Sequence, residues 1–563
     1  MSDWTIATLA AALAARRLSP VELVRDLLAR IDRLDPTLRA FITVDSDGAL
    51  TMASALEREL GAGRPRGPLH GVPMAWKDLC HVPGLPTSCG TKTREYFIDE
   101  RECEAVRRLR RAGAVGLGKL NMTELALGPF GDNPHHGDAQ NPWRAGHAAG
   151  GSSSGAGVAV AAGLVLGAVG SDTGGSIRLP AASCGVAGLK PTYGRVSRAG
   201  AMPLSWSLDH LGPMTRTVAD AALMLGAMAG HDPADATSSR RAVPDYGAAL
   251  ARGVAGLRVG LPENYYFDGV SPEVAAAVRE AARAIAGLGA VVTELRLPDP
   301  QPVTETASII TWCESSAVHA RIVRERPHEL GPVARARLEF GFHVSALEYL
   351  QAARIRARLT REFVREVFAE VDVLLAPVIP EPAPPLDRVK AGAIDDVVAR
   401  MARFARLTRP LNGLGLPALS IPCGFAASGL PLGLQIIGRP FDESTVLRVG
   451  HAYEQAAGWW TRRPPPARGG RQGTTTARAP GRTSISIGVN PAGPGRAARR
   501  RSGDGGRGPG GRPAVRGAPT VRPPARRPPE PDVPAARARS SRAGRRRPAP
   551  PGPAEARRHT AGG

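Results

Sequence analysis

From Thr461 to Gly563 the chain contains no leucine, phenylalanine, tyrosine, tryptophan, methionine, cysteine or lysine. Without large apolar side chains, such a segment cannot bury enough surface to offset the entropy cost of becoming ordered. We therefore expect residues 465–563, rich in Arg, Pro, Gly and Ala, to be a disordered tail. Residues 1–464 are expected to form the folded domain of this 563-residue protein.

The same tail carries most of the net charge. It contains 24 arginines and four acidic residues, which give 20 of the 22 net positive charges of the chain, so residues 1–460 are nearly neutral. An arginine-rich segment can bind nucleic acid without sequence preference, but this one lacks the aromatic residues that stack on bases. Nucleic acid is therefore expected as a partner only through the tail. This composition is also typical of GC-rich DNA translated in a wrong frame, and that alternative stays open.

The six cysteines form no CxxC pair, and no His/Cys cluster has zinc-ligand spacing. We expect free, buried thiols in a reducing compartment, with neither metal nor other cofactor. The longest apolar run, residues 156–170, is too short to span a membrane. Near the N-terminus the basic pair follows the apolar stretch, which is the wrong order for a signal peptide. The prediction is a cytoplasmic protein without a membrane partner.

Hydrophobic periodicity predicts strands that alternate with helices, so the fold class is α/β. A short strand with Lys77 near its end is expected within residues 69–79, and further strands at 114–118, 165–170, 257–261, 291–297, 371–378, 418–422 and 429–440. Helices are expected at residues 5–16, from Ser19-Pro20 to Asp35-Pro36, at 48–60, 102–112, 156–164, 177–184, 218–230, 272–288 and 443–457, and over most of 305–370. Residues 121–143 are expected to form a long loop of the kind that often belongs to a site.

Two Gly/Ser segments, GGSSSG at 150–155 and SDTGGS at 171–176, are each expected to precede a helix. Backbone amides and the helix dipole favour negative charge at that position. This pattern indicates a site in which one serine attacks a carbonyl carbon while amides hold the oxyanion.

The base that would activate such a serine has two kinds of candidate. His135 and His136 lie in the long loop, so a Ser-His-Asp triad stays open, but no GxSxG motif carries these serines. The alternative is Lys77 at the end of a predicted strand, which would act only if burial kept it neutral. Spacing alone favours the simpler interpretation, in which Lys77 reaches solvent beside Asp78.

Several separated segments together resemble the amidase signature family. They are GVPMAWKDL, GGSSSG, GSDTGGSIRLPAASCGVAGLKPTYGRVSRAG, SLDHLGPMTRTVADAA, GLPALSIPCGF and GLPLGLQIIGRPFDESTVLRVGHAYEQ. The resemblance covers about the first 460 residues and none of the tail. It implies a large mixed central sheet flanked by helices.

The resemblance also implies roles for particular residues. Lys77 matches the family's base, Ser152 its bridging serine on a cis peptide bond, and Ser176 its acylated nucleophile. The amides implied for the oxyanion are those of Thr173, Gly174, Gly175 and Ser176.

Neighbouring side chains are expected to have structural roles. Asp172 and Arg178 are expected to form a structural ion pair or hydrogen bonds that fix the loop, and Cys184 to pack in the core. Ser153 and Ser154 are expected to cap a helix, and His135 and His136 to be solvated loop residues.

The implied activity is hydrolysis of a small-molecule amide through an acyl-enzyme, giving a carboxylate and ammonia or an amine. The alternative is the glutamine-hydrolysing A subunit of an aspartyl/glutamyl-tRNA amidotransferase. Two segments of this chain depart from the pattern of that protein: NMTELALGPFGDN differs from it, and ESSAVHARIVRERPHELGP lacks the expected Tyr-Asp-Gly stretch. The hydrolase is therefore preferred. A homodimer and a monomer both stay open. Residues 121–143 and 305–370 are expected to shape the substrate pocket.

Overall fold

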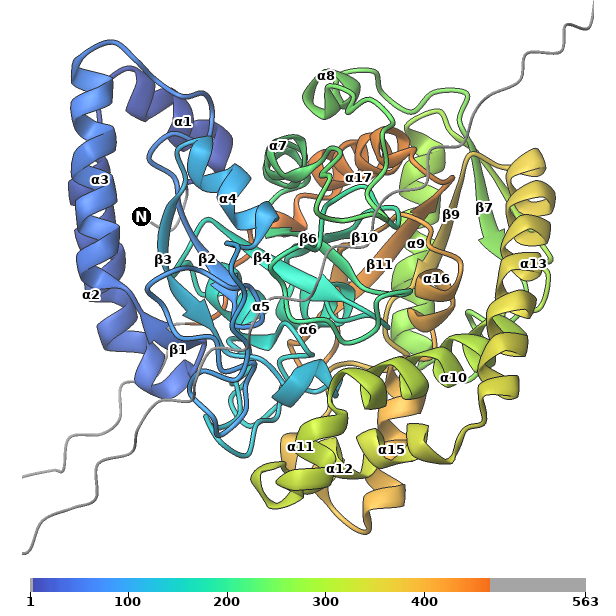
Figure 1. Ribbon diagram of the computed structural model, residues 1–563. Coiled ribbons are helices and arrows are strands. Elements are labelled where there is room, and N and C mark those ends of the chain that lie inside the picture. The colour runs from blue at the N-terminus through green and yellow to red at the C-terminus, as the bar shows by residue number, and fades with distance from the viewer. Residues whose placement is uncertain (1–3, 466–563) are drawn as a thin grey trace, which may run out of the picture. The chain divides into compact units, whose positions relative to one another are not determined.

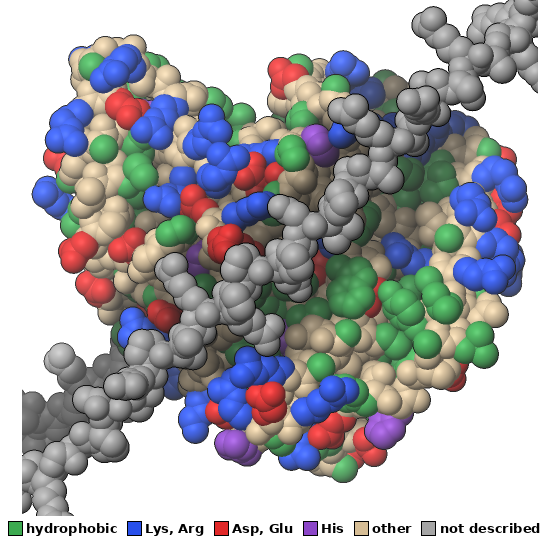
Figure 2. Space-filling view, in the orientation of Figure 1, with side chains coloured by type: hydrophobic (Ala, Val, Ile, Leu, Met, Phe, Trp, Pro, Cys, Tyr) green, Lys and Arg blue, Asp and Glu red, His purple; other side chains and the backbone are tan. Residues whose placement is uncertain are grey.

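The computed structural model describes residues 4–465, which belong to one compact unit. The predicted tail therefore lies outside the described residues, apart from Pro465. On the face shown in Figure 2, basic and acidic side chains are interspersed, in agreement with the nearly neutral charge of residues 1–460.

One eleven-stranded sheet runs through the molecule in the order β1-β3-β2-β4-β6-β5-β10-β11-β9-β7-β8 (Figure 1). The strands are β1 (Phe41–Val44), β2 (Pro73–Lys77), β3 (Val115–Leu120), β4 (Gly167–Asp172), β5 (Ala187–Lys190), β6 (His210–Thr215), β7 (Arg258–Pro262), β8 (Val291–Leu295), β9 (Val373–Pro377), β10 (Ala418–Phe425) and β11 (Pro431–Gly438). Strand β2 is parallel to β3 and β4, whereas β4–β6 and β10–β11 are antiparallel. The predicted α/β fold with a large mixed sheet is confirmed.

Helices flank the sheet (Figure 1). They are α1 (Ile6–Ala14), α2 (Pro20–Leu38), α3 (Ser46–Gly61), α4 (Glu104–Arg111), α5 (Ser154–Ala161), α6 (Arg178–Cys184), α7 (Val218–Met228), α8 (Tyr246–Leu250), α9 (Pro272–Gly287), α10 (Gln301–Val318), α11 (Ala320–Glu325), α12 (Pro332–Glu339), α13 (Ala346–Glu370), α14 (Leu386–Lys390), α15 (Ile394–Phe404), α16 (Arg409–Gly413) and α17 (Glu443–Ala457). The expected helical region 305–370 corresponds to α10–α13.

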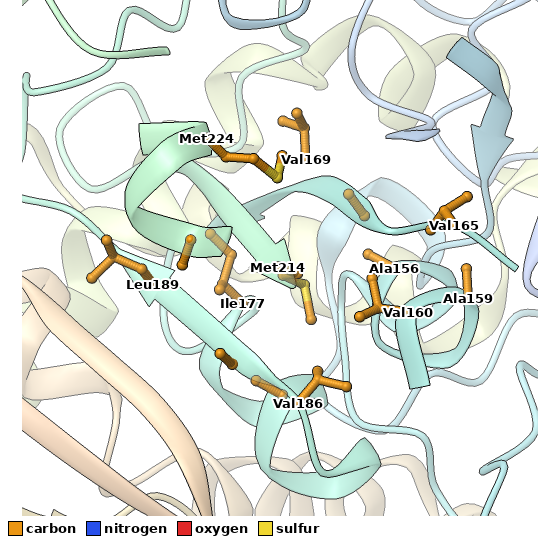
Figure 3. Packing of buried hydrophobic residues seen from close by; sticks show 14 of the residues in the cluster. Ala156, Ala159, Val160, Val165, Val169, Ile177, Val186, Leu189, Met214 and Met224 are labelled. Carbon is orange, nitrogen blue, oxygen red and sulfur yellow. The ribbon is translucent and has the colours of Figure 1, made fainter. Parts of the chain in front are cut away.

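Both faces of the central strand β4 are buried. A Cβ added at Gly167 would meet Met224 of α7, whereas one added at Gly170 would meet Ile177 and Ser153 beside α5 and α6. Because successive residues of a strand point to opposite faces, α7 covers one face of β4 and the α5–α6 pair covers the other. Figure 3 shows Val169 and Met224 together on one side, with Ile177 on the other.

The α2 helix continues beyond its predicted end at Asp35-Pro36. It runs to Leu38 with Pro36 inside, and Arg39 closes it with φ of 53°. The Asp35 carboxylate stabilises this end because it accepts a hydrogen bond from the Ala40 N–H at 2.7 Å. Inside a helix, a proline removes one backbone hydrogen bond, and its ring crowds the carbonyl group four residues earlier. The last turn of α2 tolerates both effects at Pro36.

Three strands were not predicted from the sequence. Strands β1 and β5 have only four residues each, which is too short for a clear periodic pattern. Strand β6 contains Gly212 and Pro213, a pair that favours a turn, yet it pairs with both β4 and β5. Tertiary packing overrides the local preference there, because β6 is buried along its whole length.

At Gly212 the neighbouring strand leaves no room for a side chain on β6. An added Cβ would overlap the carbonyl oxygen of Leu189. We expect Gly212→Ala to lower the free energy of unfolding by about 1–3 kcal/mol through overpacking. The matched control is Gly226→Ala on α7, where nothing lies within 4 Å, and which should raise stability by about 0.5–1 kcal/mol. Urea denaturation of both variants measures the difference, and equal stabilities would contradict this account.

Candidate active site

Lys77 is the last residue of β2 and is completely buried. Its Nζ donates to Ser152 Oγ at 2.6 Å and to Ser171 Oγ at 2.8 Å. The adjacent carboxylate, Asp78, pairs with Lys119 at 3.0 Å. Lys77 is therefore not the solvent-reaching lysine beside Asp78 that spacing alone favours. Burial disfavours the ammonium form and lowers the pKa of Lys77 to about 7.

The Ser152 loop is built around two glycines. Gly150 has φ of 75°, and the peptide bond between Gly151 and Ser152 is cis. A Cβ on Gly150 would lie 2.6 Å from Pro180 Cα, and one on Gly151 would lie 2.7 Å from the Gly128 carbonyl oxygen. Glycine at both positions lets the loop pack against its neighbours, which holds the completely buried Ser152 beside Lys77.

Three hydrogen bonds of Ser153 join the two serine loops to each other and to β4. The Ser153 N–H donates to the Ser176 carbonyl at 3.1 Å. Ser153 Oγ donates to the Ser171 carbonyl at 3.0 Å and accepts from the Ser171 N–H at 3.2 Å. Ser153 and Ser154 make no side-chain cap to α5, so the capping role expected for them is wrong. Ser154 Oγ instead donates to the Asn121 carbonyl at 3.4 Å.

The Asp172 carboxylate organises the loop that carries Ser176. Its oxygens accept from the N–H of Gly175 at 2.7 Å and of Ile177 at 3.1 Å. Arg178, completely buried, donates to both oxygens at 3.0 Å. Burial alone would raise the pKa of Asp172, but the Arg178 guanidinium holds it well below its usual range. The expected structural ion pair is confirmed.

Polar side chains from distant segments complete this support. Asn412 donates to the Asp172 carbonyl at 2.9 Å and accepts from Arg178 at 2.7 Å. Thr408 Oγ1 donates to the Gly174 carbonyl at 2.7 Å. Thr173 Oγ1 donates to Asp209 at 2.5 Å. Sequence reasoning missed Asn412, Thr408 and the roles of Asp209 and Ser171. Asp209 lies in the SLDHLGPMTRTVADAA segment of the resemblance and Ser171 begins the SDTGGS segment, so these two carried a signal, whereas Asn412 and Thr408 carried none.

A cavity of about 50 Å³ opens beside Ser176. Thr173 and Gly174 line it, together with Gly128 from the 121–143 loop and Trp312 from α10. Both regions expected to shape a substrate pocket therefore reach it. A second cavity, of about 500 Å³, shares Thr173 with the first and is also lined by Ser171 and Asp209.

The two loop histidines are engaged by protein groups. His135 Nε2 lies 2.8 Å from Glu124 Oε1, and His136 Nε2 lies 2.9 Å from the Thr91 carbonyl oxygen. Both are half-buried, so their expected role as solvated residues is wrong. Neither lines the cavity beside Ser176. The lysine is therefore the base candidate that the fold brings to the serines.

The cysteines are free thiols, and Cys184 is buried with its Sγ donating to the Ala149 carbonyl at 3.2 Å, as packing predicts. Within residues 4–465, no group of three or more His, Cys, Asp or Glu side chains is placed to hold a metal ion. In the same range, no helix is both long and apolar enough to cross a membrane.

The structure combines a mixed sheet, antiparallel at its centre, with two linked glycine-serine loops and a buried lysine at the end of β2. A family model described as Amidase matches residues 22–447, and the chain belongs to that amidase family.

Its curated relatives include the A subunit of the glutamyl-tRNA(Gln) amidotransferase of Chloroflexus aurantiacus, which is 42% identical over 81% of this chain and 97% of the relative. The protein of the same name from Geobacter metallireducens is 40% identical over 81% of this chain and 98% of the relative. Among solved structures, the peptide amidase of Stenotrophomonas maltophilia matches with a TM-score of 0.72 and 34% identity, covering 82% of this chain and 98% of that one.

The Asp172–Arg178 pair gives a stability prediction. Arg178→Ala would leave the Asp172 carboxylate buried without its cation, so we expect the free energy of unfolding to fall by about 3–5 kcal/mol. The control is Arg279→Ala, because Arg279 forms an exposed ion pair with Glu294 and its loss should cost about 0–1 kcal/mol. Guanidinium denaturation measures both variants, and a similar loss for the two would refute the structural role.

Proposed function

We propose that this protein hydrolyses a small-molecule amide, with Ser176 as the nucleophile, Ser152 as the proton relay and Lys77 as the base. The observation that carries the proposal is the 2.6 Å hydrogen bond from the completely buried Lys77 Nζ to Ser152 Oγ. The link from the Ser153 N–H to the Ser176 carbonyl supports it, because it joins the loop of the relay to that of the nucleophile.

The first half-reaction forms an ester on Ser176. Neutral Lys77 takes a proton from Ser152, which takes the proton of Ser176 as its Oγ attacks the amide carbonyl carbon. The C–N bond then breaks, and the proton returns through Ser152 to the departing nitrogen, which leaves as ammonia or an amine. In the second half-reaction water attacks the ester, its proton follows the same relay, and the carboxylate and free Ser176 are released.

The oxyanion of each tetrahedral intermediate would be held by backbone amides. The N–H groups of Thr173, Gly174 and Ser176 are the proposed donors. The Gly175 N–H already donates to Asp172 Oδ1, so it could hold the oxyanion only by sharing its hydrogen between the two acceptors. One such donor is worth about 3–4 kcal/mol of barrier, and the support of the loop by Asp172 and Thr408 would keep the donors in place.

Removing the nucleophile tests the proposal. We expect Ser176→Ala to reduce ammonia release from simple amides by at least about 10³-fold, measured with the purified full-length chain. The matched control is Ser183→Ala, a change of a buried serine hydroxyl on α6 that should retain activity. Circular dichroism checks that both variants fold. Undiminished ammonia release by Ser176→Ala would refute the nucleophile assignment.

The pH dependence tests the base. Lys77 acts only when neutral, and its pKa is lowered to about 7, so kcat/KM should rise with pH through about 7 and level off above it. In Ser171→Ala the ammonium form of Lys77 loses one acceptor, which disfavours the charged state, and the midpoint should move to lower pH. Rates from pH 5 to 11 measure both curves. A midpoint near the usual lysine pKa, or one unmoved by Ser171→Ala, would count against Lys77 as the base.

A second candidate function is that of the glutamine-hydrolysing A subunit of a tRNA amidotransferase. The 40–42% identity to proteins of that name supports it. The two candidates differ in what they require. Ammonia release by the chain alone supports the hydrolase, whereas release that appears only with partner subunits and charged tRNA supports the amidotransferase.

A further inference from the structure

Two arginines line the small cavity beside Ser176. Arg337 lies on α12, and Arg409 begins α16. Arg409 Nε lies 3.8 Å from the position that a Cβ would take on Gly174, so its guanidinium flanks the nucleophile loop. The two cations therefore reach the cavity from segments far apart in the sequence, and both face the loop on which an acyl group would form.

Neither guanidinium has an anionic partner within residues 4–465. Arg337 makes no hydrogen bond or ion pair to any residue in that range, and Arg409 makes one side-chain hydrogen bond, from Nη1 to Ser308 Oγ at 3.1 Å. Desolvation, and then the repulsion from Arg409, lower the pKa of Arg337 to about 10. Both arginines are half-buried, and two cations that line one cavity without an acidic partner favour an anionic ligand there.

No acidic side chain lines this cavity. Asp209, which accepts a hydrogen bond from Thr173, lines the cavity of about 500 Å³ but not the small cavity beside Ser176. Its oxygens already accept from Thr173 Oγ1 and from the N–H groups of Leu204 and Ser205. A ligand ammonium in the small cavity would therefore face two cations and no carboxylate.

We propose that the cavity binds an acyl group that ends in a carboxylate, held by Arg337 and Arg409, and that the substrate is a half-amide of a short dicarboxylic acid. This inference rests on the proposed amide hydrolysis and specifies its substrate class. Leu179, Leu204 and Met401 line the same cavity and give the methylene groups an apolar surface. The cavity volume of about 50 Å³ suits a short chain.

The arrangement also distinguishes between two similar amides. Glutaramate and L-glutamine have the same amide, chain and carboxylate, but glutamine adds an α-ammonium group. With two arginines and no acid around it, that ammonium would be repelled and left without a partner. The site therefore favours glutaramate over glutamine, which is the opposite of what a glutamine-using enzyme requires.

The test compares kcat/KM of the full-length protein for three five-carbon amides. Glutaramate carries the carboxylate, pentanamide is its neutral counterpart, and L-glutamine adds the ammonium. A charge-assisted hydrogen bond is strong enough to give a preference of about tenfold to a hundredfold. We expect glutaramate to exceed both other amides by at least about tenfold. A preference for pentanamide or glutamine would overturn the inference while leaving amide hydrolysis intact.

Substitution assigns that preference to Arg337. In Arg337→Gln the glutaramate-to-pentanamide ratio should fall by about tenfold to a hundredfold. Both rates are measured on one preparation, so a misfolded fraction lowers them by the same factor and leaves their ratio unchanged. The control is Arg335→Gln, on the same helix but exposed and paired with Glu339 at 2.7 Å, which should keep the ratio of the unsubstituted protein. An unchanged ratio in Arg337→Gln would overturn the assignment.

A binding measurement separates this inference from catalysis. By calorimetry, glutarate should bind the unsubstituted protein at least about tenfold more tightly than pentanoate, and Arg337→Gln should remove the difference. If no amide is hydrolysed but glutarate still binds in this way, the proposed function fails and the anion site stands. If glutarate binds no better than pentanoate, the anion site fails.

Discussion

The site depends on one amine held out of water between two hydroxyl groups. Lys77 Nζ is bonded to Ser152 and Ser171, and the nearby Asp78 is paired with Lys119. If Asp78 instead paired with Lys77, it would stabilise the ammonium form and oppose the effect of burial on the pKa of Lys77. The separate Asp78–Lys119 pair gives this neighbouring negative charge a different partner.

The surrounding structure keeps both partners of that amine in place. Ser171 is the penultimate residue of β4, which is parallel to β2, so Lys77 and Ser171 end neighbouring strands at the same edge of the sheet. Ser152 belongs to a loop fixed by close glycine contacts. The buried Asp172–Arg178 pair then positions the loop of Ser176 through backbone N–H groups. The strands, glycine contacts and ion pair thus place different parts of the proposed reaction centre.

The sequence was sufficient for the α/β class, the parallel β2–β3 unit and the residues brought together around Lys77, because these depend on periodicity and on local motifs. It did not predict β6, where Gly212 and Pro213 suggest a turn and burial between two strands decides otherwise. Nor did it predict Ser171, whose role depends on strand register, or Asn412 and Thr408, which approach the loop from more than 200 residues away. Local patterns carry no information about such approaches.

The proposed reaction centre and the two arginines of the cavity beside it come from different parts of the chain. Lys77, Ser152 and Ser176 lie within one hundred-residue stretch, whereas Arg337 and Arg409 enter from α12 and α16. Under the proposed function, changes at Arg337 and Arg409 can therefore alter what is bound, provided that Thr408 and Asn412, which support the loop of Ser176 from the same region, are kept. Such a chain can acquire a new substrate by exchanging a few side chains on two helices, which is a direct route by which one scaffold comes to serve many amides.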